Sequence, residues 1–89
     1  MGRVAMTYKL NPDSEVEANI EEIVETIKTF ASEIYEVQSV ETKPLAFGLQ
    51  FVQVHVVMDD GPGLSDKFEE MMSELTGVGE IEVLSMGLL

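Results

Sequence analysis

The sequence predicts an α+β domain in which strands and helices follow one another in the order βαββαβ. Two observations lead to this prediction. Four segments alternate apolar and polar residues, which is typical of half-buried strands, and two segments repeat apolar residues every three or four positions, as amphipathic helices do. The 89 residues have the length of a single domain, residues 1–89, and 45% of them are hydrophobic, which is enough for a folded core.

The first predicted strand runs from Arg3 to Leu10 and turns its apolar residues to one face. That face holds Val4, Met6, Tyr8 and Leu10. Asn11-Pro12-Asp13 ends the strand, because proline cannot donate a hydrogen bond to a neighbouring strand. Ser14 and Glu17 then have the spacing of a capping box, in which each side chain satisfies a free backbone amide at the start of a helix.

The first predicted helix packs one apolar stripe on the sheet. The stripe consists of Val16, Ile20, Ile23, Ile27 and Phe30, and the acidic residues fall largely outside it. A second strand is predicted from Glu33 to about Lys43, where Tyr35 and Val37 alternate with polar residues. The alternation changes phase before Val40, so the strand register is expected to shift near Ser39.

The third predicted strand, Gln50 to Met58, has the strongest strand propensity in the chain because valine recurs at every second position. Residues 59–63 predict a loop, after which Ser65 is expected to cap a second helix. The apolar stripe of this helix consists of Phe68, Met71, Met72 and Leu75, and the two methionines are interpreted as core residues. Gly77 is expected to end the helix in the left-handed conformation.

The last predicted strand runs from Glu80 to about Met86. Ile81 and Val83 are expected to point inward, and the opposite parity of Leu84 and Met86 predicts a bulge. In the order βαββαβ, two right-handed crossovers place both helices on one face of a four-stranded antiparallel sheet. The expected fold is therefore ferredoxin-like.

The formal charge of −12 limits the partners of this domain. Seventeen acidic residues against five basic ones repel nucleic acid and anionic lipid, so direct binding to either is not expected. A protein partner with a basic face, or one that itself carries a nucleotide, fits better, and like charges favour a free monomer. Met1-Gly2-Arg3 leads directly into a strand and no apolar stretch could cross a bilayer, so a cytoplasmic location is expected.

The sequence offers no set of catalytic or metal-binding residues. There is no cysteine, and the only histidine, His55, is expected on the uncovered face of the sheet with Phe51 and Gln53. Asp59 and Asp60 lack the spacing of a calcium loop, and neither glycine pair matches a phosphate-binding loop. No cofactor, no metal and no enzymatic reaction are therefore expected.

The turn between the second and third strands is unusually apolar. Residues 44–48 comprise Pro44, Leu45, Ala46, Phe47 and Gly48, where polar residues are normally chosen. From the residues alone, Phe47 either packs under the edge of the sheet or is offered to a partner.

The stretch Lys43-Pro44-Leu45-Ala46-Phe47-Gly48-Leu49, followed by strand 51–58 and Asp59-Asp60-Gly61, resembles the archaeal elongation factor 1-beta family. The resemblance extends over the whole chain. It implies guanine nucleotide exchange, that is GDP release and GTP binding, on elongation factor 1-alpha, the GTPase that delivers aminoacyl-tRNA to the ribosome. The function implied is thus protein binding.

The resemblance also implies which residues bind the GTPase. The phenylalanine of the apolar turn enters a pocket on the GTPase in related domains, which corresponds here to Phe47 held by its neighbours Pro44, Leu45, Ala46 and Gly48. Related chains end in a basic residue that reaches the magnesium and phosphate site. Residues 85–89 contain none, so Met86, Gly87, Leu88 and Leu89 either act on the partner sterically, with the terminal carboxylate, or serve only as packing.

Two other hypotheses share the predicted fold. A ligand-sensing or dimerising regulatory domain would form dimers and gain stability from a small metabolite. An acylphosphatase-like enzyme would need an arginine in a phosphate-cradling loop, whereas Arg3, the only arginine, lies in a predicted strand.

Overall fold

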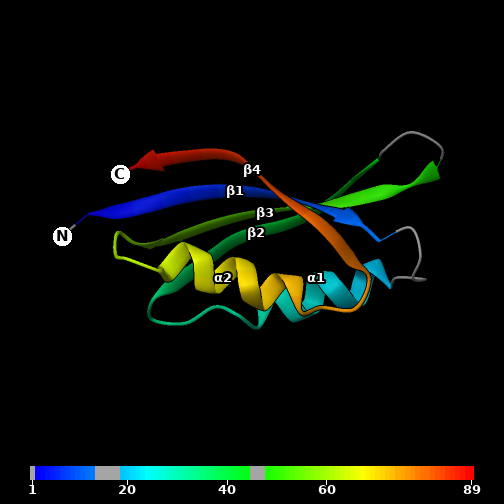
Figure 1. Ribbon diagram of the computed structural model, residues 1–89, viewed down its shortest axis with the longest axis horizontal. Helices are drawn as coiled ribbons and strands as arrows, with labels where there is room; N and C mark the ends of the chain where they lie inside the picture. Colours follow the sequence, from blue (N-terminus) through cyan, green and yellow to red (C-terminus); the bar gives the residue numbers. More distant parts are fainter. Residues whose placement is uncertain (1, 14–18, 45–47) are drawn as a thin grey trace.

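The computed structural model describes residues 2–13, 19–44 and 48–89. These residues form a four-stranded antiparallel sheet with two helices on one face, in the order βαββαβ (Figure 1). The strands are β1 (Arg3–Pro12), β2 (Tyr35–Pro44), β3 (Gln50–Asp59) and β4 (Val78–Leu88), and the helices are α1 (Ile20–Lys28) and α2 (Leu64–Ser73). The strand order β2-β3-β1-β4 confirms the ferredoxin-like prediction. Neither helix is long and apolar enough to span a membrane.

The two central strands, β1 and β3, carry most of the core. Their side chains alternate between buried and half-buried, as the sequence pattern predicted. The buried residues facing the helices are Val4, Met6, Tyr8 and Leu10 on β1, and Val52, Val54, Val56 and Met58 on β3; Val57, on the other face of β3, is also buried. Two residues from each helix pack on these strands and complete the core: Ile23 and Ile27 from α1, and Phe68 and Met72 from α2. Met71 also packs against this core, which confirms the interpretation of both methionines.

Phe68 of α2 lies at the centre of an aromatic cluster. Its ring centroid is 4.9 Å from that of Tyr35, 5.9 Å from that of Phe30 and 6.0 Å from that of Tyr8. The Tyr35 hydroxyl donates a 2.6 Å hydrogen bond to the backbone oxygen of Leu64, and the Tyr8 hydroxyl donates one of 3.2 Å to Glu69. The cluster therefore fixes α2 on β1 and β2 by both packing and hydrogen bonds.

Both predicted irregularities of the edge strands occur. The register of β2 on β3 shifts between Val37 and Ser39, and that of β4 on β1 shifts at Leu84, because Ser85 pairs with Thr7 and Val83 with Tyr8. Each shift leaves one extra residue in the edge strand and returns the following residues to the opposite parity.

The helix ends differ in part from the prediction. The helix α2 begins one residue before Ser65, with Gly63 as its N-cap and no side-chain capping bond. Leu64 belongs to the first turn of the helix, because its side chain packs on the core and its backbone oxygen accepts the hydrogen bond from the Tyr35 hydroxyl. Gly77 does have a positive φ of 94°, but α2 already ends at Ser73, so this glycine makes the turn into β4 instead.

The helix α1 is capped by Asn19, whose side chain accepts a 3.2 Å hydrogen bond from the backbone amide of Glu22. Val16 and the predicted capping box of Ser14 and Glu17 lie outside the described residues.

We expect Phe68→Ala to destabilise the protein by about 3–5 kcal/mol, because it empties the centre of the aromatic cluster. Urea unfolding followed by far-UV circular dichroism measures this loss. Leu49→Ala, which truncates a side chain that is 52% exposed, is the control and should cost less than about 1 kcal/mol. Equal losses in the two variants would show that the cluster does not organise the core.

We expect stability to fall at alkaline pH, and Tyr8→Phe to reduce this fall. Burial, and secondly the negative charge of Glu69, raise the pKa of Tyr8 well above its ordinary value of 10.0. The unfolded phenol loses its proton near pH 10 while the folded one keeps it, so the contribution is complete below that pH and is lost as the pH rises beyond it.

Urea unfolding of both proteins at pH 8, 10 and 11 measures the effect. Tyr35 contributes to the alkaline loss of stability in both proteins, because burial raises its pKa as well. An alkaline loss of equal size in wild type and Tyr8→Phe would contradict the assignment to Tyr8.

Candidate functional site

The first candidate contact region is the β2–β3 connection. The strand β2 ends at Pro44 and β3 begins at Gln50, and the described residues around the connection, including Lys43, Gly48 and Leu49, are exposed. Gly48 has a φ of 76°, in the left-handed region that favours glycine. Leu45, Ala46 and Phe47 lie outside the described residues, so the predicted role of Phe47 stays a prediction.

The second candidate region is the C-terminal part of β4, which exposes a strip of large apolar side chains. Met86 is 70% exposed, Leu88 75% and Leu89 74%, and Val83 and Leu84 are each 49% exposed. Met86 pairs with Met6 and Leu88 with Val4, so both face the side of the sheet that carries the helices. Figure 1 shows β4 diverging from α2 toward the edge of the sheet, which explains why no helix covers them.

This exposure bears on the expectation that Val83 points inward. Val83 was expected to point inward; it lies on the helix side opposite Tyr8, but it is 49% exposed. The side chains of Met86 and Leu88 are exposed, and whether the tail acts on a partner or serves only as packing stays a prediction. Met86 and Leu88, two positions apart on one face of β4, expose apolar surface of the kind that another molecule often covers.

A small cavity of about 80 Å³ adjoins the apolar strip. Its apolar lining includes Val4, Met6, Met58 and Met86, and its rim includes Asp59, Asp60 and Ser65 from the end of β3 and the start of α2. Both aspartates are exposed. The strip therefore continues into a hollow with a methionine-rich floor and an acidic edge.

The two candidate regions lie at opposite ends of the sheet. In Figure 1 the end of β2 and the start of β3 are at one end, and the end of β4 is at the other. The molecule measures 43 × 20 × 18 Å. The structure does not bring Pro44 and Gly48 together with Met86–Leu89, and a partner that touches both regions must extend along most of the long axis.

Several side chains on the open face of the sheet contact one another. His55 is half-buried there, with its Nδ1 atom 3.1 Å from the hydroxyl oxygen of Thr7, and Lys9 lies 4.8 Å from the centre of the Phe51 ring. These contacts agree with the predicted structural or surface role of His55. Within residues 2–13, 19–44 and 48–89, no group of three or more side chains is arranged to hold a metal ion.

Comparison with known proteins identifies the family. Residues 5–89 match the model of the EF-1 guanine nucleotide exchange domain. The chain belongs to this family. It is similar to elongation factor 1-beta of Ignicoccus hospitalis, with 40% identity over 93% of this chain and 88% of the relative. It is also similar to elongation factor 1-beta of Archaeoglobus fulgidus, with 34% identity over the whole of both chains, and to that of Methanothermobacter thermautotrophicus, with 35% identity over 93% and 92%.

Membership of the exchange-domain family confirms the resemblance first seen in residues 43–61. The chain is a guanine nucleotide exchange factor for elongation factor 1-alpha in translation elongation. This result favours exchange over the ligand-sensing and acylphosphatase-like hypotheses, which share only the fold.

Sequence analysis missed three parts of the candidate surface of this exchange domain. Val83 looked like a core residue because strand parity does not show where a covering helix ends. The contribution of Met58 to the cavity beside Met86 depends on a pairing between strands far apart in the chain. Ser65 looked like a cap, whereas it lines the same cavity.

Proposed function

We propose that this chain accelerates GDP release from elongation factor 1-alpha by contacting the GTPase at both ends of its sheet. The observation that carries the proposal is the exposed apolar strip at Met86, Leu88 and Leu89, together with Gly87 between them. The second contact is the apolar turn of residues 44–48, with Phe47 as its anchor.

The anchor role of Phe47 is supported by its neighbours. Pro44 ends β2, Gly48 adopts a left-handed conformation, and both are exposed where β2 ends and β3 begins. An aromatic residue that enters a partner's pocket commonly dominates the binding energy.

Exchange follows from thermodynamic linkage. A protein that binds the nucleotide-free GTPase more tightly than the GDP-bound GTPase weakens GDP binding by the same factor. Two contacts separated by most of the 43 Å length suit this task. One holds the partner while the other favours the conformation in which the nucleotide site is open.

The contact at β4 acts without a basic side chain. Residues 83–89 contain no lysine or arginine, so no cation from this segment can compete with the magnesium ion of the GTPase. Met86 and Leu88 instead offer apolar bulk beside the cavity rimmed by Asp59 and Asp60. We infer a steric action at this end, in which apolar side chains wedge against the partner.

The remaining properties follow from the charge and from the role in translation. We propose that residues 1–89 work as one domain in the cytoplasm, catalyse no chemical reaction of their own, and bind neither nucleic acid nor membrane. The net charge of −12 supports a monomeric free state, because copies of the chain repel one another.

We expect Phe47→Ala to weaken binding to elongation factor 1-alpha by about 2–4 kcal/mol and to abolish most of the acceleration of GDP release. The measurement is release of a fluorescent GDP analogue from purified archaeal elongation factor 1-alpha. Ile34→Ala is the control, because Ile34 is 40% exposed and lies outside both proposed contacts. Full acceleration by Phe47→Ala would remove the turn from the mechanism, and no acceleration by wild type would refute the proposed function.

We expect the double variant Met86→Gln, Leu88→Gln to fold normally and to accelerate GDP release at least about fivefold less than wild type, which corresponds to a loss of about 1 kcal/mol or more. Both side chains are at least 70% exposed, so the substitutions leave the core and the β1–β4 pairing intact. Ile34→Gln tests whether any added polarity has the same effect. Unchanged release with the double variant would leave exchange in place but exclude the apolar strip.

A further inference from the structure

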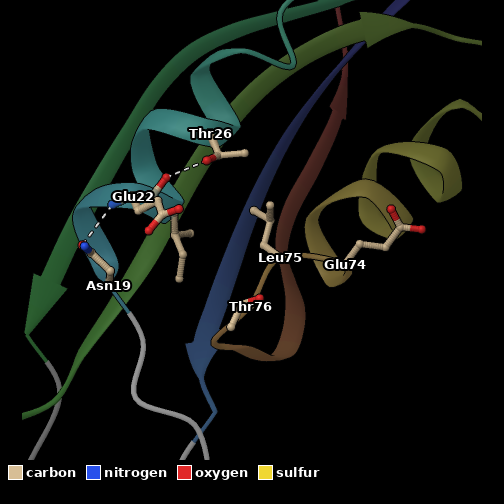
Figure 2. A pocket seen from close by; sticks show the side chains of 7 residues that line it. Asn19, Glu22, Thr26, Glu74, Leu75 and Thr76 are labelled. Atoms are coloured by element: carbon tan, nitrogen blue, oxygen red, sulfur yellow. Dashed lines mark hydrogen bonds between the residues drawn. The ribbon is translucent and has the colours of Figure 1, made fainter.

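A groove between the two helices has no role in the mechanism above. It lies between the start of α1 and the end of α2 and has a volume of about 390 Å³ (Figure 2). Its floor is apolar, since Ile23 belongs to the buried core and Leu75 packs against that core. Glu22 lies on the α1 side of the groove and Glu74 at the end of α2, and both are exposed; in Figure 2 the Glu74 side chain extends away from Leu75.

The neutral polar side chains of the α1 wall are already engaged within the helix. Asn19 accepts a 3.2 Å hydrogen bond from the backbone amide of Glu22, and the Thr26 hydroxyl donates one of 2.8 Å to the Glu22 carbonyl, as the dashed lines in Figure 2 show. The two carboxylates are therefore the charged groups of the groove that remain available to a ligand.

The described part of the chain supplies no cation to this groove. Arg3, Lys9, Lys28 and Lys43 form ion pairs elsewhere, with distances between 3.5 and 4.0 Å. The remaining basic residue, Lys67, does not line the groove. No salt bridge forms at Glu22 or Glu74 among residues 2–13, 19–44 and 48–89.

The position of Glu74 is electrostatically unfavourable for the isolated domain. It is the C-cap of α2, and the last turn of this helix contains no basic residue. The C-terminus of a helix carries partial negative charge, so an acidic side chain there destabilises the helix. Glu22, in contrast, lies in the first turn of α1, where the helix favours it. Helix stability therefore favours an acidic residue at position 22 but not at position 74.

We propose that this groove binds a lysine or arginine side chain on a basic segment of elongation factor 1-alpha. The aliphatic stem of that side chain lies on Ile23 and Leu75, and its charged group lies at the rim of the groove, where the exposed carboxylates of Glu22 and Glu74 attract it. A long basic side chain matches both the apolar floor and the acidic walls, whereas phosphate groups are repelled by them.

This inference rests on the proposed function and extends the contact at the turn. Figure 1 places the start of α1 and the end of α2 at the same end of the molecule as the end of β2 and the start of β3. A partner that receives Phe47 therefore has the groove within reach. The groove supplies the charged part of the contact, and the turn supplies the apolar part.

The test compares Glu74→Lys with Glu33→Lys. Both variants change the net charge equally, but Glu33 is exposed, lies beyond the far end of α1 and does not line the groove. We expect Glu74→Lys to weaken binding to nucleotide-free elongation factor 1-alpha roughly three- to tenfold at low salt, and Glu33→Lys less than about twofold. The difference should shrink at high salt, because ions screen exposed charges.

Thermal unfolding of the free variants separates this role from a structural one. A lysine at the C-terminus of α2 is favourable, so Glu74→Lys should unfold at the same temperature as wild type or higher while it binds more weakly. Equal binding by the two variants, with wild type active in exchange, would overturn this inference alone. Wild type without exchange activity would overturn the proposed function and this inference together.

A metal ion is the competing occupant. If millimolar magnesium chloride raised the unfolding temperature of wild type but not that of Glu74→Lys, the groove would be a cation site and the proposal would be wrong. We expect no such rise, because the described residues that line the groove include only two carboxylates.

Discussion

The packing of Phe68 against Tyr8, Tyr35 and Phe30 is the interaction on which the arrangement of the domain depends. It ties α2 to β1, to β2 and to the segment that follows α1, which are distant in the sequence. Because the cluster holds α2 over the central strands, the helix leaves the C-terminal part of β4 uncovered. The exposed strip at Met86 and Leu88 is thus a consequence of where the aromatic core lies.

Most of the fold could be predicted because local pattern and tertiary environment agree. Val52 to Val56 alternate in the sequence and in burial, since a strand with neighbours on both sides and helices above it turns one face to the core; Val57, on the other face, is also buried. The bulge at Leu84 could also be predicted, because a strand that changes parity while it stays paired must contain an extra residue. The helix ends could not, since Leu64 joins α2 through a hydrogen bond from Tyr35, 29 residues away.

The candidate site could be predicted only in part, and for a related physical reason. The apolar turn at Pro44 and Gly48 and the residues of the tail stand out in the sequence, and the family resemblance assigns them to a partner. The cavity beside Met86 and the groove between Glu22 and Glu74 do not stand out, because each is assembled from segments far apart in the chain. Composition shows that the chain is acidic, but only the fold shows which acidic residues have partners.

The two layers of the domain, the sheet and the helices, differ in net charge. The sheet strands contain three of the five basic residues, and each of them forms an ion pair within the sheet: Arg3 with Asp59, Lys9 with Glu82 and Lys43 with Glu41. The helices and the C-cap of α2 contain seven acidic residues against Lys28 and Lys67. Exposed ion pairs add little stability, but they reduce the net charge of the sheet layer. The excess negative charge therefore collects on the helix layer, where a partner with a basic surface gains the most from binding.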